Sequence, residues 1–494
     1  MNRGEPAMRF IHAIREFNLE RETDLQVVAV YTEVDRQARF VREADDAISL
    51  GDATWVDERD GLRRPTYLNH AVLARALQEC RADAVWCGWG FVAERPEFVE
   101  WCERTGLAFI GPSSGAMRRL GDKINAKRQA TQAGIPVVDW GGAPVDSLEG
   151  ARAQAERLGY PVMVKASGGA GGRGIRRVDR PEQLDRALGA VRRDAARVFL
   201  DDTVFLERYL EQVRHLEVQV QADRHGNVWA VGTRDCSLQR RFQKLMSEAP
   251  APDLAPDLEA ALVDAAVRLV AAARYEDQAS VEFLASPDGR FFFLEANPRL
   301  QVEHVVTEQT TGIDLVKLQL HVALGGRVEP VLSSPQGHAV EVRLNAEDPY
   351  NDFAPSPGIV SLFRVPTGPG LRIDTGIAEG DVMPAEFGAM FAKVAARGHS
   401  REEALGRLKR ALSESAVVIS GGPTNRSFVL DVLDDRELRR GGVDTGWLDR
   451  RQLAESTRPE RHARIALLQA AVEVYEGELE REIDAFFASA ARMR

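Results

Sequence analysis

Residues 165–178, KASGGAGGRGIRRV, contain a glycine cluster with the formal pattern G-x-G-x-x-G. In a dinucleotide-binding protein this pattern opens a helix whose N-terminus meets the pyrophosphate. Here the short apolar runs 161–164 and 175–178 flank the cluster, so we predict two strands joined by a glycine hairpin. A dinucleotide fingerprint is therefore excluded, and so is a Walker A loop, because no Gly-Lys-Ser/Thr follows. We expect a mobile flap that closes over phosphates, with Lys165 at its base and Arg173 at its tip.

The composition sets the class of protein. The 494 residues should form about three domains, and the chain is 44% hydrophobic and 28% charged, which is typical of a globular protein. A net charge of −11 argues against nucleic-acid binding, and no apolar run approaches the roughly 20 residues of a membrane span. We find no signal-peptide pattern and no C-x-x-C pair among four cysteines, so we predict a cytoplasmic protein. The nine histidines do not cluster, so carboxylates should hold any metal, as Mg²⁺ or Mn²⁺.

Three patterns follow one another along the chain. Residues 1–114 alternate short apolar runs, such as 26–31, with helical patterns, such as 67–81, which predicts a parallel sheet with crossover helices. Residues 115–325 instead indicate hairpins, and a third part, 335–450, opens with the strand HAVEVRLNA. The predicted fold class is therefore α/β combined with α+β.

A second hairpin, residues 280–304 (SVEFLASPDGRFFFLEANPRLQVEH), carries the strongest chemical signal. The turn SPDG should pair two strands, with Glu282 opposite Phe293 and diagonal to Glu295. Diagonal partners stand about 7–8 Å apart, so these carboxylates would repel each other unless a cation lay between them. We therefore predict a cation site. The alternative is two solvated carboxylates on an open sheet face.

If the chain stays extended beyond Glu295, alternate side chains share one face. That face then carries a candidate metal ligand, two amides, a guanidinium and a second carboxylate: Glu295, Asn297, Arg299, Gln301 and Glu303. Such a row suits a small anion held between a metal-bound phosphate and a base. Other charged or titratable side chains can converge on this row, although each alone is equally well explained as a solvated surface residue: Lys123, Lys165, His215, Lys244 and Arg343.

The chain resembles biotin carboxylase, an ATP-grasp enzyme, over about residues 2–450. The resemblance lies in the runs NRGEPAMR, GDKINAKRQATQAGIP, GYPVMVKASGGAGGRGIR, FLERYLEQVRHLEVQV, CSLQRRFQK, EANPRLQVEHVVTEQTTG and GHAVEVRLNAEDP. It implies a Rossmann-like N-terminal domain (1–114), an ATP-grasp domain (115–325) with a flap subdomain at about 138–206, and a C-terminal biotin carboxylase domain (335–450).

The resemblance also implies a role for each matching residue. ATP contacts are expected from Lys123, Lys165, Gly171, Gly172, Glu207, Arg208, Tyr209, Leu210, His215, Gln239, Glu282 and Glu295. The implied magnesium ligands are Glu282, Glu295 and Asn297, and the implied bicarbonate contacts are Lys244, Arg299, Gln301 and Val302. Glu303 is expected to be the general base, with Lys244 and Arg299 also catalytic, and Arg343 is expected to face the biotin ring.

The implied reaction is the ATP-dependent carboxylation of biotin with bicarbonate through carboxyphosphate. It needs ATP, Mg²⁺ or Mn²⁺, and biotin as the carrier-linked substrate. The implied partners are a biotin carboxyl carrier protein or domain and a carboxyltransferase component, in an oligomer without nucleic acid or membrane. The sequence leaves open which acceptor, such as acetyl-CoA, propionyl-CoA or pyruvate, finally receives the carboxyl group.

Some positions depart from the family pattern. Phe242 stands where a histidine is usual, Ser247 replaces a glutamate, and the first apolar strand of the N-terminal sheet is not found ahead of Asn2. Two alternatives therefore stay open. One is another ATP-grasp ligase, such as a carbamoyl-phosphate or amino-acid ligase. The other is a degenerate, non-catalytic scaffold component of a carboxylase.

The tail, residues 459–494, is predicted to be one long charged helix. Its apolar residues fall on roughly one stripe: Ile465, Leu468, Ala471, Val472, Tyr475, Leu479, Ile483 and Phe486. A helix of about 30 residues with such a stripe is rarely stable alone in water. We expect it to dock on a partner or on a further downstream domain rather than on its own domain.

Overall fold

The computed structural model describes residues 1–169, 172, 174–199, 201–330, 335–451 and 463–491. Of these residues, those from 1 to 450 form one compact unit, and residues 451 and 463–491 belong to a second. No helix within the described ranges combines the length and the apolar character needed to cross a membrane. The predicted roles of Gly171 and Arg173 fall outside the described residues.

The N-terminal part alternates helices and short strands, as predicted. Strand β1 (Val28–Tyr31) pairs in parallel with β2 (Asp46–Ser49), and β5 (Ala84–Trp86) pairs in parallel with β6 (Ala108–Ile110). The prediction of one parallel sheet is wrong, because no strand within the described residues joins β1 to β5. The amino group of Met1 donates instead to the carbonyl of Trp86. The other elements here are α1 (Gly4–Arg21), α2 (Arg39–Glu43), β3 (Thr54–Val56), β4 (Arg63–Pro65), α3 (His70–Glu79), α4 (Pro96–Thr105) and α5 (Ser114–Leu120).

The glycine cluster does lie between two strands. Strands β7 (Val162–Ala166) and β8 (Ile175–Val178) pair antiparallel, and β9 (Val204–Arg208) lies on the other side of β7. No helix opens at the glycines, so the hairpin prediction is confirmed for the described residues. This three-stranded sheet packs against α7 (Leu148–Leu158) and α8 (Leu184–Phe199) through one apolar cluster, and α6 (Lys123–Gln132) precedes it in the chain.

One eight-stranded sheet forms the centre of the unit, in the order β16-β15-β10-β11-β14-β17-β23-β21. Its first five strands come from the hairpin region and its last three from the C-terminal part, so the sheet crosses the predicted boundary at residues 325–335. The strands are β10 (Arg214–Ala222), β11 (Val228–Asp235), β14 (Met246–Ala249), β15 (Asp277–Ala285), β16 (Phe291–Asn297), β17 (His338–Asn345), β21 (Leu371–Thr375) and β23 (Met390–Gly398).

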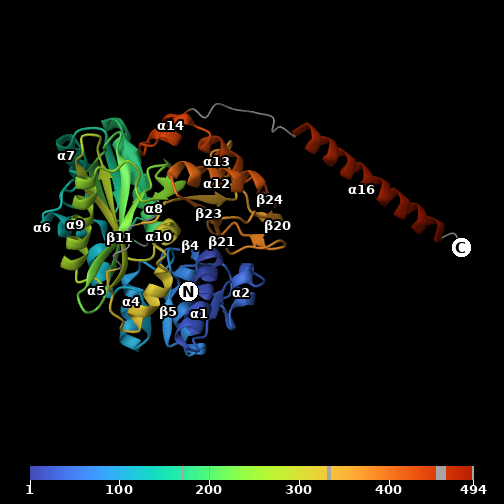
Figure 1. The fold of residues 1–494 in the computed structure, drawn as a ribbon, viewed down its shortest axis with the longest axis horizontal. Helices are drawn as coiled ribbons and strands as arrows, with labels where there is room; N and C mark the ends of the chain where they lie inside the picture. Colours follow the sequence, from blue (N-terminus) through green and yellow to red (C-terminus); the bar gives the residue numbers. More distant parts are fainter. Residues whose placement is uncertain (170–171, 173, 200, 331–334, 452–462, 492–494) are drawn as a thin grey trace. The chain divides into compact units, whose positions relative to one another are not determined.

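The two faces of this sheet differ because side chains alternate along each strand. On β10, Leu216, Val218 and Val220 pack into an apolar cluster beneath α9 (Pro256–Ala272), which lies beside β10 and β11 in Figure 1. The alternating residues His215 and Glu217 are polar but buried, so they point to the opposite face. That polar face holds the candidate site.

Short elements complete the unit. A two-residue hairpin joins β12 (Gln239–Arg240) to β13 (Gln243–Lys244). The helices α10 (His304–Thr311) and α11 (Leu315–Ala323) follow β16. The C-terminal part adds β18 (Glu347–Asp348), β19 (Ala354–Pro355), β20 (Gly358–Arg364), β22 (Val382–Met383), α12 (Arg401–Glu414), β24 (Ala416–Ile419), α13 (Arg426–Leu433), α14 (Arg436–Arg440) and α15 (Trp447–Arg450).

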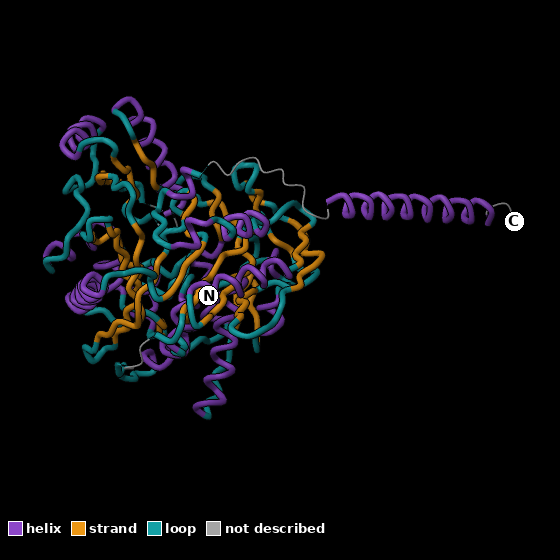
Figure 2. Tube along the Cα trace, turned by 45° about the horizontal axis from the view of Figure 1, so that its top comes forward, coloured by secondary structure: helices purple, strands orange, loops and turns teal. Residues whose placement is uncertain are grey.

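The second unit contains the predicted tail helix, α16 (Ala463–Ala491). It runs for 29 residues, and Figure 2 shows it as one uninterrupted helix.

Candidate active site

A row of four charged residues crosses four adjacent strands of the polar face. Strand pairing places Arg234 on β11 opposite Glu217 on β10, Glu217 opposite Glu282 on β15, and Glu282 opposite Glu295 on β16. The predicted diagonal register of Glu282 and Glu295 is wrong, because Leu294 is an extra, bulged residue and the two carboxylates oppose each other directly. Directly opposed like charges destabilise a sheet unless they are compensated.

Lys244, at the end of β13, supplies much of that compensation. Its ammonium lies 3.0 Å from Glu282 Oε1 and 2.6 Å from Glu303 Oε1, and it also contacts Glu217 Oε1. Burial lowers the pKa of Lys244, but the three carboxylates more than offset this effect and raise it well above its usual value. Lys244 therefore stays charged at neutral pH.

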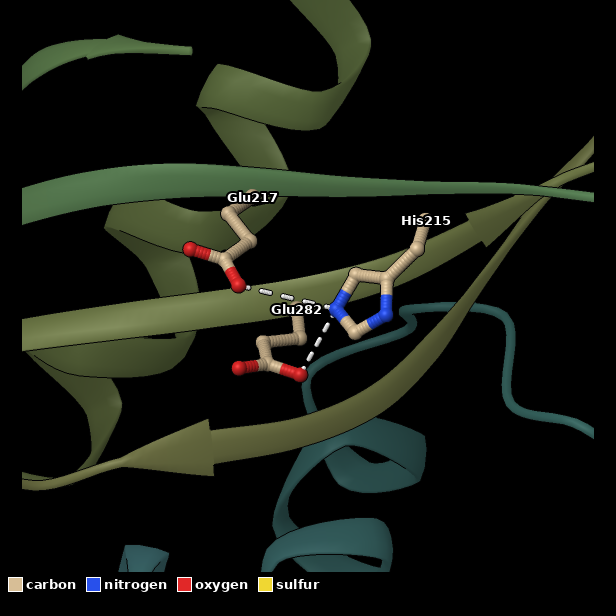
Figure 3. Close-up of side chains that lie close together, drawn as sticks. All are labelled: His215, Glu217 and Glu282. Atoms are coloured by element: carbon tan, nitrogen blue, oxygen red, sulfur yellow. Dashed lines mark ion pairs between the residues drawn. The ribbon is translucent and has the colours of Figure 1, made fainter. Parts of the chain in front are cut away.

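His215 completes the arrangement on β10. Its Nε2 lies 2.7 Å from Glu282 Oε2 and 3.6 Å from Glu217 Oε1, and Gln239 Nε2 lies 2.7 Å from its Nδ1. Figure 3 shows the imidazole ring facing both carboxylates. Burial raises the pKa of Glu282, yet Lys244 and His215 outweigh burial and bring that pKa down to about 2. Glu282 is thus a carboxylate at any physiological pH.

Glu303 is fully buried and lies between two cations. One carboxylate oxygen accepts from Lys244 and the other accepts from Arg343 Nη2 at 2.8 Å. Burial raises the pKa of Glu303, but Lys244 and Arg343 more than compensate and the pKa lies below its ordinary value. We call Lys244, Glu217, Glu282, Glu303 and Arg343 the Lys244 network.

The segment after Glu295 does not continue as a strand to Glu303, as we expected, because β16 ends at Asn297 and Glu303 is the residue that precedes α10. The predicted row nevertheless converges. Arg299 donates to Asn297 Oδ1 at 2.9 Å and to Gln301 Oε1 at 2.6 Å. Asn297 and Gln301 each donate in turn to Glu282 Oε1, at 2.7 and 2.9 Å.

Three lysines lie toward the glycine hairpin, and we call them the flap-side lysines. Lys123 pairs with Glu295, while Lys127 and Lys165 lie 2.7 and 2.5 Å from the two oxygens of Glu207. The side chain of Lys165 is 11% exposed and that of Lys127 is 1% exposed. Lys165 can therefore exchange its carboxylate partner for a ligand more easily than Lys127.

The remaining predicted residues lie at the edges of this region. Arg208 ends β9 and is exposed, Leu210 is partly buried, and the Tyr209 ring lies 4.2 Å from the Arg177 guanidinium. A side chain at Gly172 would meet the Phe242 carbonyl at 2.8 Å, so this glycine packs against the turn between β12 and β13.

Several residues of the site were not identified from the sequence. Glu217 could have been found, because it is two residues from His215 on a predicted strand and so shares its face. Arg234, Glu94 and Lys393 gave no local signal. Glu94 accepts from Arg299, and Lys393 donates to the Val302 carbonyl at 2.9 Å, from segments far away in the sequence.

The donor set fits a hard divalent cation. Glu282 and Glu295 stand directly opposite each other, and Asn297 lies beside them, with its amide nitrogen on Glu282 Oε1 and its amide oxygen accepting from Arg299. Magnesium prefers such oxygen ligands together with phosphate oxygens. His215, Glu217 and Glu282 form another grouping, whose three ligand atoms lie within 4.8 Å of one another.

Comparisons with known proteins agree with this geometry. Three family models match in order: the biotin carboxylase N-terminal domain over residues 1–117, the carbamoyl-phosphate synthase L chain ATP-binding domain over 122–331, and the biotin carboxylase C-terminal domain over 341–450. Biotin carboxylase 1 of Bacillus subtilis is 39% identical over 91% of this chain and 97% of its own length. The alpha3 chain of a biotin-dependent acyl-coenzyme A carboxylase of Mycobacterium leprae is 41% identical over 91% and 73%.

Solved structures show the same similarity. The biotin carboxylase of Campylobacter jejuni, in a complex described as β,γ-ATP, aligns with a TM-score of 0.83 at 36% identity, covering 91% of this chain and 97% of that one. The biotin carboxylase domain dimer of the Hydrogenobacter thermophilus 2-oxoglutarate carboxylase, with MgADP, ADP and bicarbonate, aligns with a TM-score of 0.83 at 35% identity, covering 91% and 96%.

Proposed function

The chain belongs to the biotin carboxylase family, and we propose that the Lys244 network is where it carboxylates biotin with ATP and bicarbonate. Biotin carboxylases are ATP-dependent ligases that form a carbon–nitrogen bond. The observation that carries the proposal is the Glu303 carboxylate, fully buried and held between Lys244 and Arg343. A carboxylate in that place can accept a proton beside a bound anion.

Glu303 acts as the general base on bicarbonate. Lys244 and Arg299, with Gln301 and the backbone around Val302, hold the bicarbonate anion. As Glu303 takes the bicarbonate proton, a bicarbonate oxygen attacks the γ-phosphorus of ATP, and ADP leaves as carboxyphosphate forms. Charge stabilisation by fixed cations supplies most of the catalysis in phosphoryl transfer.

Lys123, Lys165, His215 and the glycine flap bind the nucleotide, and the β9 end, Glu207 to Leu210, binds its adenine side. Glu282, Glu295 and Asn297 would hold the magnesium ion, which neutralises phosphate charge when it is bound. The flap excludes water, since carboxyphosphate in an open site would be lost to hydrolysis. Gln239 keeps His215 oriented through its Nδ1.

The second half of the reaction transfers the carboxyl group. Carboxyphosphate breaks into carbon dioxide and phosphate, and the phosphate takes the ureido N–H proton of biotin. The resulting nitrogen anion attacks carbon dioxide and gives N-carboxybiotin. Arg343 stabilises the negative charge on the ureido oxygen, which makes it the contact that faces the biotin ring.

We further propose the partners that this chemistry requires. A biotin carboxyl carrier protein or domain brings the biotin, a carboxyltransferase component receives the carboxyl group, and the chain works in an oligomer in the cytoplasm. The Mycobacterium leprae relative is named as one of the subunits of a carboxylase, and this name supports such an assembly.

Fixation of labelled carbon tests the function. The purified chain is incubated with ATP, Mg²⁺, free biotin and ¹⁴C-bicarbonate. Acid-labile, methylation-stabilised label should appear in biotin only when ATP is present, together with equimolar ADP. Label-free biotin with unchanged ATP would instead support the non-catalytic scaffold, and ADP formation that needs an amine or amino acid would support another ATP-grasp ligase.

A further inference from the structure

The helix α16 carries an exposed apolar seam. Leu468, Val472, Tyr475, Leu479 and Ile483 follow one another at spacings of three or four residues, so they share a stripe about 80° wide at 3.6 residues per turn. All five side chains are exposed, Leu468 by 67% and Tyr475 by 66%. Ile465 and Phe486 continue the spacing in the sequence, at positions whose side chains are not described.

Acidic residues border this seam on both sides. On the same helical projection, Glu476 and Glu482 lie about 60° to either side of the centre of the seam. Between Leu468 and Ala485 there are six acidic residues and one basic residue, Arg481, which projects from the opposite side of the helix. The seam is therefore apolar at its centre and negative along both edges.

The same acidic residues, together with a glycine, lower the stability of the isolated helix. Three acidic pairs stand four residues apart, Glu476–Glu480, Glu478–Glu482 and Glu480–Asp484, and each such pair destabilises a helix by about 0.2–0.5 kcal/mol. Gly477 in its interior costs about 1 kcal/mol relative to alanine. A binding surface with basic residues would offset the repulsion between the acidic pairs, and its apolar residues would cover the seam.

The acidic edges of the seam determine which kinds of partner can bind α16. A second copy of α16 would bring acidic edges against acidic edges, in either orientation. Anionic lipid headgroups and nucleic-acid phosphates would likewise be repelled. We propose that α16 is a docking element for a basic amphipathic helix of another polypeptide, whose apolar stripe packs on Leu468–Ile483 and whose Lys and Arg residues pair with Glu476 and Glu482.

Hydrogen exchange on the full chain tests this proposal with a synthetic probe. The probe is a four-heptad peptide with Leu at positions a and d and Lys at e and g, and the matched control peptide has Glu at e and g. The amides of residues 463–491 should exchange rapidly in the free chain and become protected with the Lys peptide only. The protection should weaken in about 0.5 M NaCl, where surface charges are screened.

Two charge-reversal pairs locate the contact. Glu476→Lys with Glu482→Lys changes the edges of the seam and should weaken binding of the Lys peptide at least tenfold. Glu473→Lys with Asp484→Lys makes the same change in net charge on the far side and should weaken it less than threefold. Equal losses for the two pairs would overturn the proposal. Protection of α16 in the free chain would also overturn it: protection that is constant on dilution would mean docking on its own chain, and protection lost on dilution would mean docking on a second copy. A lack of protection with the Lys peptide would overturn it as well.

Discussion

The flap-side lysines and the Lys244 network hold their charges in different ways. Lys123 pairs with one carboxylate, Glu295, and Lys165 shares one carboxylate with Lys127. Lys244 instead contacts three carboxylates, and Glu303 contacts two cations. At the flap-side lysines, a phosphate that binds one lysine replaces a single ion pair. The second arrangement is a connected network in which each member contacts at least one other and most are held by several partners.

This difference suggests a division of labour. Exchangeable pairs suit binding, because a nucleotide phosphate can replace a carboxylate at a lysine with little change elsewhere. A connected network suits chemistry, because removing one member takes a partner away from other buried charges. Substitutions of Lys123 or Lys165 should therefore change nucleotide affinity, and substitutions in the Lys244 network should change turnover.

The largest effect is expected from Glu303→Gln. The amide keeps the shape of the side chain but cannot accept the bicarbonate proton, so bicarbonate-dependent ATP cleavage should fall at least about 100-fold. Nucleotide affinity should stay within about threefold, because a base contributes to chemistry rather than to uniform binding. Steady-state kinetics and nucleotide titration check both values, and unchanged turnover in a folded variant would remove Glu303 from the mechanism.

The next effect is expected from Lys165→Met. Loss of a charge-assisted contact to phosphate costs about 1.5–3 kcal/mol, so the KM for ATP should rise by roughly tenfold or more while the KM for bicarbonate stays within about twofold. Lys127→Met is the matched control, since Lys127 pairs with the same Glu207 but is almost fully buried. If both variants raise the ATP KM equally, Lys165 acts only through Glu207.

The third prediction concerns Glu341, a buried carboxyl group near Arg343 that has no ion-pair partner among the described residues to keep it ionised. It lies buried on β17, two residues from Arg343, and burial raises its pKa to about 8. Above the unfolded-state pKa of about 4.3, the unfolded chain releases the Glu341 proton while the folded protein keeps it. The stability that Glu341 contributes is therefore fully present at low pH and is lost as the pH rises through about 8. Relative to the wild type, Glu341→Gln should gain at least about 1 kcal/mol of stability between pH 5 and pH 9. Denaturant midpoints measure this gain, and a difference that does not vary with pH would contradict it.

The smallest effect is expected at Phe242. Its ring is 38% exposed in the turn between β12 and β13, and it cannot form a hydrogen bond to a phosphate or ribose. Phe242→His should restore one bond worth about 0.5–1.5 kcal/mol and tighten the apparent affinity for ATP by about two- to tenfold. Weaker binding in this titration would mean that the ring contributes by packing.

Much of the site was predictable because its residues lie on regular strands or in recognisable runs. The glycine hairpin followed from the absence of a helix after the cluster, Glu282 followed from the spacing across the SPDG turn, and Lys244 and Glu303 followed from matching runs. Register was less predictable. The bulge at Leu294 brings Glu282 opposite Glu295, and nothing in the local sequence distinguishes a bulge from a regular pair.

Long-range partners were the least predictable. Glu94 and Lys393 reach Arg299 and the Val302 carbonyl from distant segments, so only the folded chain reveals them. The separation of the β1–β2 and β5–β6 pairs was also not derivable from the alternation of strands and helices, which predicts one sheet. Local pattern fixes which residues share a face, and tertiary packing decides which faces meet.

Oxygen transfer from bicarbonate tests the central claim most directly, that the Lys244 network activates bicarbonate for attack on ATP. The chain is incubated with ATP, Mg²⁺, biotin and ¹⁸O-bicarbonate, and the released phosphate is analysed by mass spectrometry. Since a bicarbonate oxygen forms the new bond to phosphorus, one ¹⁸O should appear in each phosphate released. Phosphate that carries no ¹⁸O from bicarbonate, while ATP is still cleaved, would show that water attacks the nucleotide and would contradict this account.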